Sequence, residues 1–208
     1  GNVEGNASNE YFPLLPNSPY ASSKASVDLI LRSYNKTFGL PFINLRCCNN
    51  YGPFQFPEKF IPTIILNLMN GKKIPIYGKG QNLREWIFVD DFCSAIEIIF
   101  KKGKNNNIYN VGSQNRITNF ELIKKIKKIF EIKFNYKIKK NYFEYVKDRP
   151  GHDFSYKINS NKIREELNWN AKINFDYGLE KTIRWFMENK SWIKYTKNKY
   201  RGERLGQL

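Results

Sequence analysis

Apolar residues along the chain alternate between helical spacing and short strand-like runs, with turn-forming residues between them. The clearest helix is predicted over residues 18–38. Ser18 can cap free amides at its start, Pro19 is tolerated in a first turn, and Gly39 follows its end. This segment is therefore expected to form a long helix with well-defined ends.

The rest of the chain repeats the alternation. Strands are predicted at residues 42–48, 74–77, 86–89, 108–111 and 142–146. Further helices are predicted at residues 61–70, 90–100, 162–167 and 177–188, and one begins at the capping box of Thr118 and Glu121. Residues 49–53 and 148–153 are predicted to be a turn cluster and a loop. Strands that alternate with helices favour an α/β protein with a mostly parallel sheet.

The charge balance is strongly basic, with 35 Lys and Arg against 19 Asp and Glu, a net charge of +16. An anionic partner is plausible on these numbers. The lysines are scattered among Asn, Ile, Phe and Tyr, however, and no run of like charge reaches the roughly five residues of an interaction tail. A solvated basic surface is therefore favoured over a nucleic-acid-binding module, which stays open as an alternative.

The chain's cysteines and its apolar runs bear on its compartment. The three cysteines include an adjacent pair, which suits neither a disulfide framework nor a metal site, so we expect small buried residues in a reducing compartment. No apolar run approaches the roughly 18 residues that span a bilayer. A cytoplasmic protein without membrane contacts is expected. Because the chain opens at Gly1 in a polar stretch without periodicity, we also expect it to be the C-terminal part of something longer.

Tyr20 and Lys24 are the first candidates for chemistry. Four residues apart on a helix, their side chains are neighbours, and a nearby cation stabilises phenolate relative to phenol. The pair is a plausible acid/base unit. Spacing does not identify it, since Tyr136 with Lys140 has the same interval. What distinguishes Tyr20 is its place at a helix start, followed by small residues against which a flat reagent can lie.

The segment Ser18-Pro19-Tyr20-Ala21-Ser22-Ser23-Lys24-Ala25 resembles the Tyr-x-x-x-Lys site of the extended short-chain dehydrogenase/reductase family. Further motifs follow in order: Asn49-Asn50-Tyr51-Gly52-Pro53, Phe56-Pro57-Glu58-Lys59-Phe60, Ile74-Pro75-Ile76-Tyr77-Gly78, Arg84-Glu85-Trp86, Tyr109-Asn110-Val111-Gly112 and Asp148-Arg149-Pro150-Gly151-His152-Asp153. Together they resemble the dTDP-glucose 4,6-dehydratase branch of that family, over nearly the whole chain.

This resemblance implies a lyase that uses NAD and acts on dTDP-glucose or a related nucleotide sugar in deoxysugar biosynthesis. Tyr20 is implied to take the proton of the sugar 4-hydroxyl, with NAD as hydride acceptor, and Lys24 to support both. Asn50 is implied to contact the cofactor. The residues implied to hold the substrate are Asn49, Lys59, Phe60, Pro75, Ile76, Tyr77, Arg84, Asn119, Asp148, Arg149, Pro150, Gly151 and His152.

Several of these residues have a simpler interpretation. Arg84 and Arg149 are fork-shaped donors suited to a diphosphate, but each also has acidic residues close in the sequence with which it can pair. His152 is more often a loop hydrogen-bonding residue than a base. Asn49 and Asn50 can be ordinary turn residues. Both interpretations stay open for each residue.

The resemblance also implies a domain organisation and a homodimer. Residues 1–50 are expected to be the C-terminal half of a Rossmann-like NAD-binding domain, and residues 51–190 mainly a smaller, mixed α/β nucleotide-sugar-binding region with some elements returning to the Rossmann-like core. Residues 191–208 are expected to be a tail. The helix that begins near Tyr20 is implied to pair with its mate in the dimer, and no metal, nucleic-acid or membrane partner is implied.

Two family features are missing from the sequence. It has no Gly-x-Gly-x-x-Gly turn for a dinucleotide, and no Thr-Asp-Glu run, whose acids drive the loss of water in the resembling enzymes. We therefore expect this chain by itself to be unstable and inactive. A sister enzyme, such as a nucleotide-sugar epimerase or a UDP-glucuronate decarboxylase, and a non-catalytic remnant are further alternatives.

Overall fold

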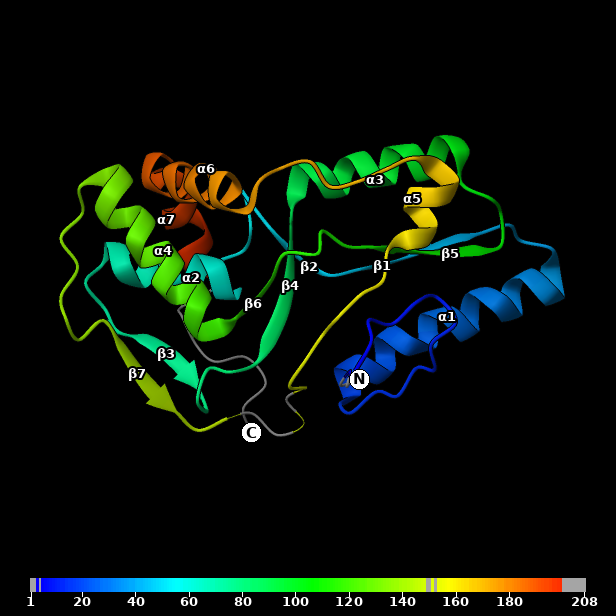
Figure 1. Cartoon of the computed structure of the whole chain (residues 1–208), viewed down its shortest axis with the longest axis horizontal. Helices are drawn as coiled ribbons and strands as arrows, with labels where there is room; N and C mark the ends of the chain where they lie inside the picture. The colour runs from blue at the N-terminus through cyan, green and yellow to red at the C-terminus, as the bar shows by residue number, and fades with distance from the viewer. Residues whose placement is uncertain (1–2, 4, 149–150, 152, 200–208) are drawn as a thin grey trace. The chain divides into compact units, whose positions relative to one another are not determined.

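The computed structural model of the chain (Figure 1) describes residues 3, 5–148, 151 and 153–199. The helices are α1 (Pro19–Phe38), α2 (Phe60–Met69), α3 (Val89–Lys102), α4 (Asn119–Phe134), α5 (Asn161–Leu167), α6 (Phe175–Glu188) and α7 (Lys190–Lys199). The strands are β1 (Ile43–Cys47), β2 (Asn49–Tyr51), β3 (Ile74–Tyr77), β4 (Leu83–Phe88), β5 (Asn107–Val111), β6 (Arg116–Thr118) and β7 (Phe143–Val146).

The chain folds into two compact units, each assembled from three separate segments. Unit 1 comprises Gly1–Asn50, Gln81–Ile117 and Asp148–Lys172, and unit 2 comprises Tyr51–Gly80, Thr118–Lys147 and Ile173–Leu208. Strand pairing is parallel both between β1 and β5 and between β3 and β7. A further small sheet has the order β2-β4-β6. The α/β class with parallel pairing is therefore confirmed.

The core of unit 1 lies beside the β1–β5 pair. Leu45 of β1 is level with Tyr109 of β5, which is fully buried. Helix α3 packs on β4, and α5 packs on β5 and on α3. Their buried side chains form one apolar cluster: Ile87, Ala95, Ile99, Tyr109, Val111, Ile163, Leu167 and Trp169. This cluster fixes the strands whose ends carry the site described below.

The core of unit 2 lies between helices and the β3–β7 pair. Helix α2 contacts β3, α4 and α6, and α6 also contacts α4 and α7 (Figure 1). Along β3, Ile74 and Ile76 are buried while Pro75 and Tyr77 are only half-buried, as expected for a strand whose side chains alternate between faces. One face of β3 thus supplies the core, and the other carries two of the predicted substrate residues.

Most predicted elements are confirmed, and the differences have local causes. Helix α1 has Ser18 as its N-cap and Gly39 in a left-handed conformation at its end, as predicted. Residues 49–51 form β2 rather than a turn, because β4 offers them a pairing partner. Residues 190–199 form α7, which packs on α6, although residues 191–208 were expected to be a tail.

The structure also shows how exposed the cysteines are and how apolar the helices are. The expectation of buried cysteines is wrong for Cys47 and Cys93, which are exposed; Cys48 is half-buried, and all three thiols are free. Among the described residues, none of the helices combines the length and the apolar character that a bilayer crossing needs.

Candidate functional site

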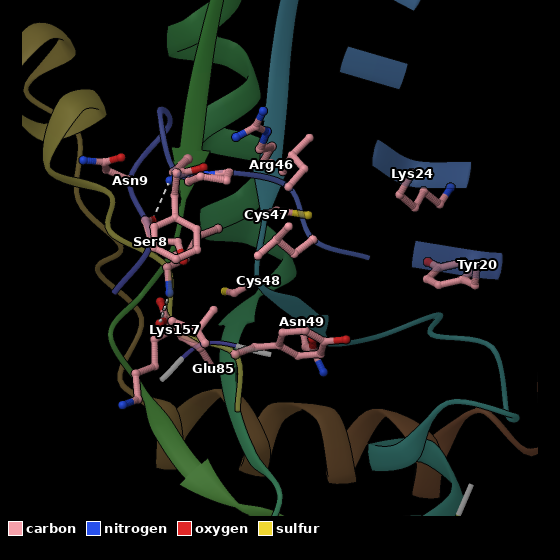
Figure 2. A pocket seen from close by; sticks show the side chains of 18 residues that line it. Ser8, Asn9, Tyr20, Lys24, Arg46, Cys47, Cys48, Asn49, Glu85 and Lys157 are labelled. Atoms are coloured by element: carbon pink, nitrogen blue, oxygen red, sulfur yellow. Dashed lines mark hydrogen bonds between the residues drawn. The ribbon is translucent and has the colours of Figure 1, made fainter. Parts of the chain in front are cut away.

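A cavity of about 390 Å³ opens in unit 1 (Figure 2), within the range of small-molecule sites. Tyr20 and Lys24 line it from α1, and Cys47, Cys48 and Asn49 line it from β1 and the start of β2. The rest of the lining comes from the segment before α1, from β4 and β5, and from residues 156–158. Three of the predicted site residues therefore meet at one cavity.

Tyr20 and Lys24 form a contacting pair on the wall of this cavity. The Lys24 Nζ atom lies 5.5 Å from the centroid of the Tyr20 ring, a cation–π arrangement. The Tyr20 side chain remains 73% exposed, so its hydroxyl is accessible to a ligand. Figure 2 shows both side chains together on α1, across from Cys47 and Asn49. The phenol, the ammonium and the opening of the cavity thus lie at the same place.

Local interactions set the position of α1. The Ser18 hydroxyl accepts a hydrogen bond from the Ala21 amide, which fixes the first turn that contains Tyr20. One turn beyond Lys24, the Asp28 carboxylate forms an ion pair with Arg46 of β1 at 2.5 Å. Asn44 also donates to Asp28. Because no residue of α1 is buried, these polar contacts hold the helix to β1.

The two asparagines have different surroundings. Asn49 lines the cavity directly. The Asn50 side chain instead donates a hydrogen bond to the Cys47 Sγ atom at 3.5 Å. Cys47 itself lines the cavity. Although the residue as a whole is exposed, partial desolvation of its Sγ atom raises the pKa of the thiol, and the Asn50 contact acts in the opposite direction. Asn50 thus borders the cavity wall through Cys47.

Glu85 is a buried carboxylate in the wall of the cavity. Its side chain is fully buried and pairs with the Arg116 guanidinium at 2.9 Å. It also accepts hydrogen bonds from the Ser113 and Gln114 amides, both at 3.0 Å. A Cβ atom at position 112 would collide with this carboxylate, which explains Gly112. Burial raises the pKa of the Cys48 thiol, and the negative charge of Glu85 adds to the effect.

Arg84 is buried and bonded to the main chain of residues 153–154. Its Nη2 atom donates to the Asp153 carbonyl at 2.6 Å, and its Nη1 atom donates to the Phe154 carbonyl at 3.1 Å. The guanidinium lies 4.5 Å from the centroid of the Tyr156 ring. The adjacent Glu85 pairs with Arg116, so an ion pair with Glu85 does not account for Arg84.

The loop predicted at residues 148–153 is described in part. Asp148 is exposed, and Gly151 lies against Asn17 with a φ of 64°. A Cβ at position 151 would approach the Asn17 carbonyl oxygen to 2.7 Å, so the close contact requires glycine. Arg149, Pro150 and His152 lie outside the described residues.

The remaining predicted substrate residues belong to unit 2. Lys59 is the N-cap residue of α2 and contacts Glu58, and Phe60 is the first residue of that helix. Tyr77 ends β3, and its carbonyl accepts from Gly80, whose own carbonyl accepts from the Phe120 amide. The end of β3 therefore lies against the start of α4, where Asn119 is the first residue. Ile76 points into the core, whereas Pro75 and Tyr77 share the opposite face of β3.

Sequence reasoning missed several cavity residues. Glu85 and Asn110 lie within quoted motifs, and the available signal for Glu85 was a charged residue directly before the apolar run from Trp86 to Val89. Tyr156 and the residues before α1 gave no such signal, because only the fold brings them to the cavity. Within the described ranges, no three His, Cys, Asp or Glu side chains gather in a way that could hold a metal ion.

Comparison with known proteins gives consistent relatives. A probable dTDP-glucose 4,6-dehydratase of Sinorhizobium fredii is 43% identical over 201 residues, which cover 96% of this chain and 57% of that protein. DesIV of Streptomyces venezuelae, a dTDP-glucose 4,6-dehydratase solved with NAD and TYD bound, has a TM-score of 0.88 and 40% identity over 95% of this chain and 59% of that one. A Bacillus anthracis dTDP-glucose 4,6-dehydratase in complex with NAD has a TM-score of 0.87 and 43% identity, over 95% and 61% of the two chains.

The chain therefore spans somewhat more than half the length of these relatives. The resemblance to dTDP-glucose 4,6-dehydratases, expected from the motifs, is confirmed by these similarities. The profile of the GDP-mannose 4,6 dehydratase family matches residues 1–182, which is most of the chain. The chain belongs to the GDP-mannose 4,6 dehydratase family.

Proposed function

We propose that this chain supplies the base and the nucleotide-sugar contacts of a dTDP-glucose 4,6-dehydratase, which converts dTDP-glucose to dTDP-4-keto-6-deoxyglucose. The observation that carries the proposal is the contact of Tyr20 with Lys24 on the wall of a ligand-sized cavity. Relatives of that name, at about 40% identity over most of the chain, support the choice of substrate.

Tyr20 is the base in this proposal. Its accessible phenolic oxygen takes the proton of the sugar 4-hydroxyl as the C4–H bond breaks. The transfer uses the phenolate form of Tyr20, and the Lys24 ammonium lies 5.5 Å from the centre of the same ring. The exposed face of α1 thus provides both groups without any rearrangement of the helix.

The cavity wall fits the nicotinamide and ribose end of NAD. An exposed phenol and an ammonium are suitable hydrogen-bonding groups for ribose hydroxyls, and both face a cavity of small-molecule size. Tyr20 and Lys24 would hold the ribose, and Asn50 would border the ring through Cys47. When bound, NAD supplies the acceptor for the C4 hydride and returns that hydride later. The residues of this chain orient the ring, exclude water and move the proton.

The substrate residues fall into two sets, one in each unit. In unit 1, substrate contacts come from Asn49 in the cavity wall. Arg84 and the loop from Asp148 to His152 complete this set. In unit 2, Pro75 and Tyr77 provide a flat face suited to a nucleobase, with Asn119 at the adjacent helix start. Lys59 and Phe60 complete this set, whereas the Ile76 side chain packs in the core and supports the strand that carries Pro75 and Tyr77.

We further propose that the functional form is a homodimer that pairs α1 with a second copy. Val27, Ile30, Tyr34 and Phe38 recur at helical spacing on α1 and are between 41% and 73% exposed. Such a continuous apolar stripe on a helix is typical of an interface between helices.

The test is product formation by an extended protein that carries this chain together with the NAD-binding half that the family resemblance implies, supplied with NAD. With dTDP-glucose, mass spectrometry is expected to show a 4-keto product that has lost one water, and UDP-glucose and UDP-glucuronate are expected to be poor substrates. Binding of thymidine diphosphate, measured by calorimetry, tests the nucleotide contacts independently of turnover. A 4-epimer from UDP-glucose, or decarboxylation of UDP-glucuronate, would overturn the proposal in favour of a sister enzyme.

A further inference from the structure

Asp153 is a buried carboxylate that the proposed chemistry does not use. It is only 5% exposed. Its Oδ1 atom accepts a hydrogen bond from the Asn17 side chain at 2.7 Å, and its Oδ2 atom accepts one from the Tyr156 hydroxyl. Its main-chain carbonyl accepts from Arg84 at 2.6 Å. Three parts of unit 1 that are distant in sequence therefore meet at this residue.

The first of these parts is the segment that leads into α1. Asn17 directly precedes Ser18, whose hydroxyl caps the helix, and Tyr20 lies in the first turn. The main chain of Asn17 is also in close contact with Gly151. The segment around Gly151 and Asp153 is thus in contact with the start of α1 at two points, one through the main chain and one through the Asp153 carboxylate.

The other two parts are Tyr156 and Arg84. Tyr156 lines the cavity, and its ring lies under the Arg84 guanidinium. Its amide donates to the Leu83 carbonyl, which places it beside β4. A carboxylate can only accept, so the Tyr156 hydroxyl must direct its proton at Asp153. The same carboxylate therefore orients a residue of the cavity wall and the entry to α1.

We propose that Asp153 is a positioning residue that holds the first turn of α1, and with it Tyr20, in register with the Tyr156 side of the cavity. The inference rests on the proposed function for the role of Tyr20. The contacts themselves do not depend on the proposed function. The carboxylate binds the Asn17 and Tyr156 side chains at the same time, and an asparagine amide has only one oxygen to replace the two acceptors.

The experiment uses hydrogen exchange and NMR on the chain with Asp153→Asn and, separately, Asn17→Ala. Asn17 is exposed, so its substitution removes the contact without disturbing the core. Both variants are expected to speed amide exchange at residues 21–23 by about tenfold, the effect of one charge-assisted hydrogen bond, and to shift the ring signals of Tyr20. Exchange in α3 and α6 is expected to stay unchanged. The matched control is Glu165→Gln, on the exposed face of α5.

The double variant separates positioning from general loosening. If Asp153 acts on α1 through Asn17, adding Asn17→Ala to Asp153→Asn causes no further increase in the amide exchange rate at the start of α1. Unchanged amide exchange and unchanged Tyr20 signals in both single variants would overturn the inference. It would also be overturned if the double variant showed the sum of the two single-variant changes in amide exchange.

Thymidine diphosphate binding to the unmodified chain distinguishes this inference from the proposed function. If the nucleotide fails to bind but the variants still disturb Tyr20, the proposed substrate is wrong and the positioning role of Asp153 stands. If the nucleotide binds and the variants leave Tyr20 undisturbed, the proposed function is supported and the role of Asp153 is refuted.

Discussion

The Lys24 ammonium lies 5.5 Å from the centre of the Tyr20 ring, one turn along α1 and on the same face of the helix. This contact distinguishes the pair from others of the same spacing, because it coincides with the wall of a cavity. Neither residue is needed for packing, since α1 contributes no buried residue to the core. Chemistry and stability are thus separable at this position.

Tyr20→Phe is expected to abolish product formation while leaving the fold intact. Loss of a positioned acid/base group typically lowers a rate by about 10²- to 10⁴-fold, whereas the exposed ring can lose its hydroxyl at little cost in stability. Turnover of dTDP-glucose by the extended protein measures the loss of activity, and thermal unfolding measures the stability. Tyr177→Phe on α6, an exposed tyrosine with Lys181 over its ring, is the matched control, and full activity in Tyr20→Phe would refute the base assignment.

Glu85→Gln is expected to destabilise unit 1 by about 1.5–3 kcal/mol, the range for hydrogen bonds to a buried charged group. The substitution removes the ion pair with Arg116 and weakens the acceptor for two main-chain amides. Urea unfolding measures the change. Glu97→Gln, which breaks an exposed ion pair on α3, should leave the midpoint unchanged. Equal midpoints for both variants would contradict the structural role of Glu85.

The three thiols are expected to react with iodoacetamide at pH 8 in the order Cys93, Cys47, Cys48. Cys93 is exposed, and the thiolate is the reactive form. Burial raises the pKa of Cys47 and, more strongly, that of Cys48, where Glu85 adds a like charge. Peptide mass spectrometry over a time course gives the order, and the differences should vanish in urea. Labelling of Cys48 as fast as that of Cys93 would count against the burial of the Cys48 thiol.

Asp153 is expected to make stability depend on acid pH. Burial by itself raises the pKa of its carboxyl, but hydrogen bonds from Tyr156 and Asn17 and the charge of Arg84 outweigh it and lower the pKa. A lowered pKa contributes stability above the usual value of about 3.9, and this contribution is lost as the pH falls through the lowered value. The gap in unfolding free energy between the unmodified chain and Asp153→Asn should therefore be widest near neutral pH.

That gap should narrow as the pH falls below about 4, where the Asp153 carboxyl of the unfolded chain becomes protonated, and should close as the pH falls through the lowered pKa of the folded chain. Urea unfolding at a series of pH values measures it. Glu165→Gln, on the surface of α5, should show no comparable trend. A gap that stays constant from neutral to acid pH would show that Asp153 is not held ionised by its partners.

Ile30→Lys is expected to reduce self-association through α1. A lysine in the middle of the exposed stripe places a charge where two helices would bury apolar surface. Light scattering coupled to size-exclusion chromatography measures the mass in solution. Arg32→Gln, an exposed change elsewhere on α1, is the control. A dimer that persists unchanged in Ile30→Lys would locate the interface on another surface.

The residue pattern was sufficient to predict elements whose ends depend on local chemistry. Ser18 and Gly39 bound α1, and Thr118 with Glu121 forms the predicted capping box at the start of α4. These signals act within one or two helical turns, so neighbouring residues contain the information. The pairing of Tyr20 with Lys24 belongs to the same class, since helical geometry makes residues four apart adjacent.

Features that depend on distant partners were not predicted. Strand β2 exists because β4 pairs with it, and α7 is stabilised by packing on α6. The burial of Glu85 against Arg116, and the exposure of two of the three cysteines, follow from which strands and loops surround them.

The sequence by itself thus determined the α/β class, the ends of the long helices and the adjacency of Tyr20 and Lys24 on α1, because each is encoded over a few residues. Only the tertiary structure decided that a cavity opens beside Tyr20 and that Asp153 joins Asn17, Tyr156 and Arg84. These contacts join residues up to 136 positions apart. Hydrogen bonds and packing between such distant segments form only when the whole unit folds, so a local sequence pattern does not predict them.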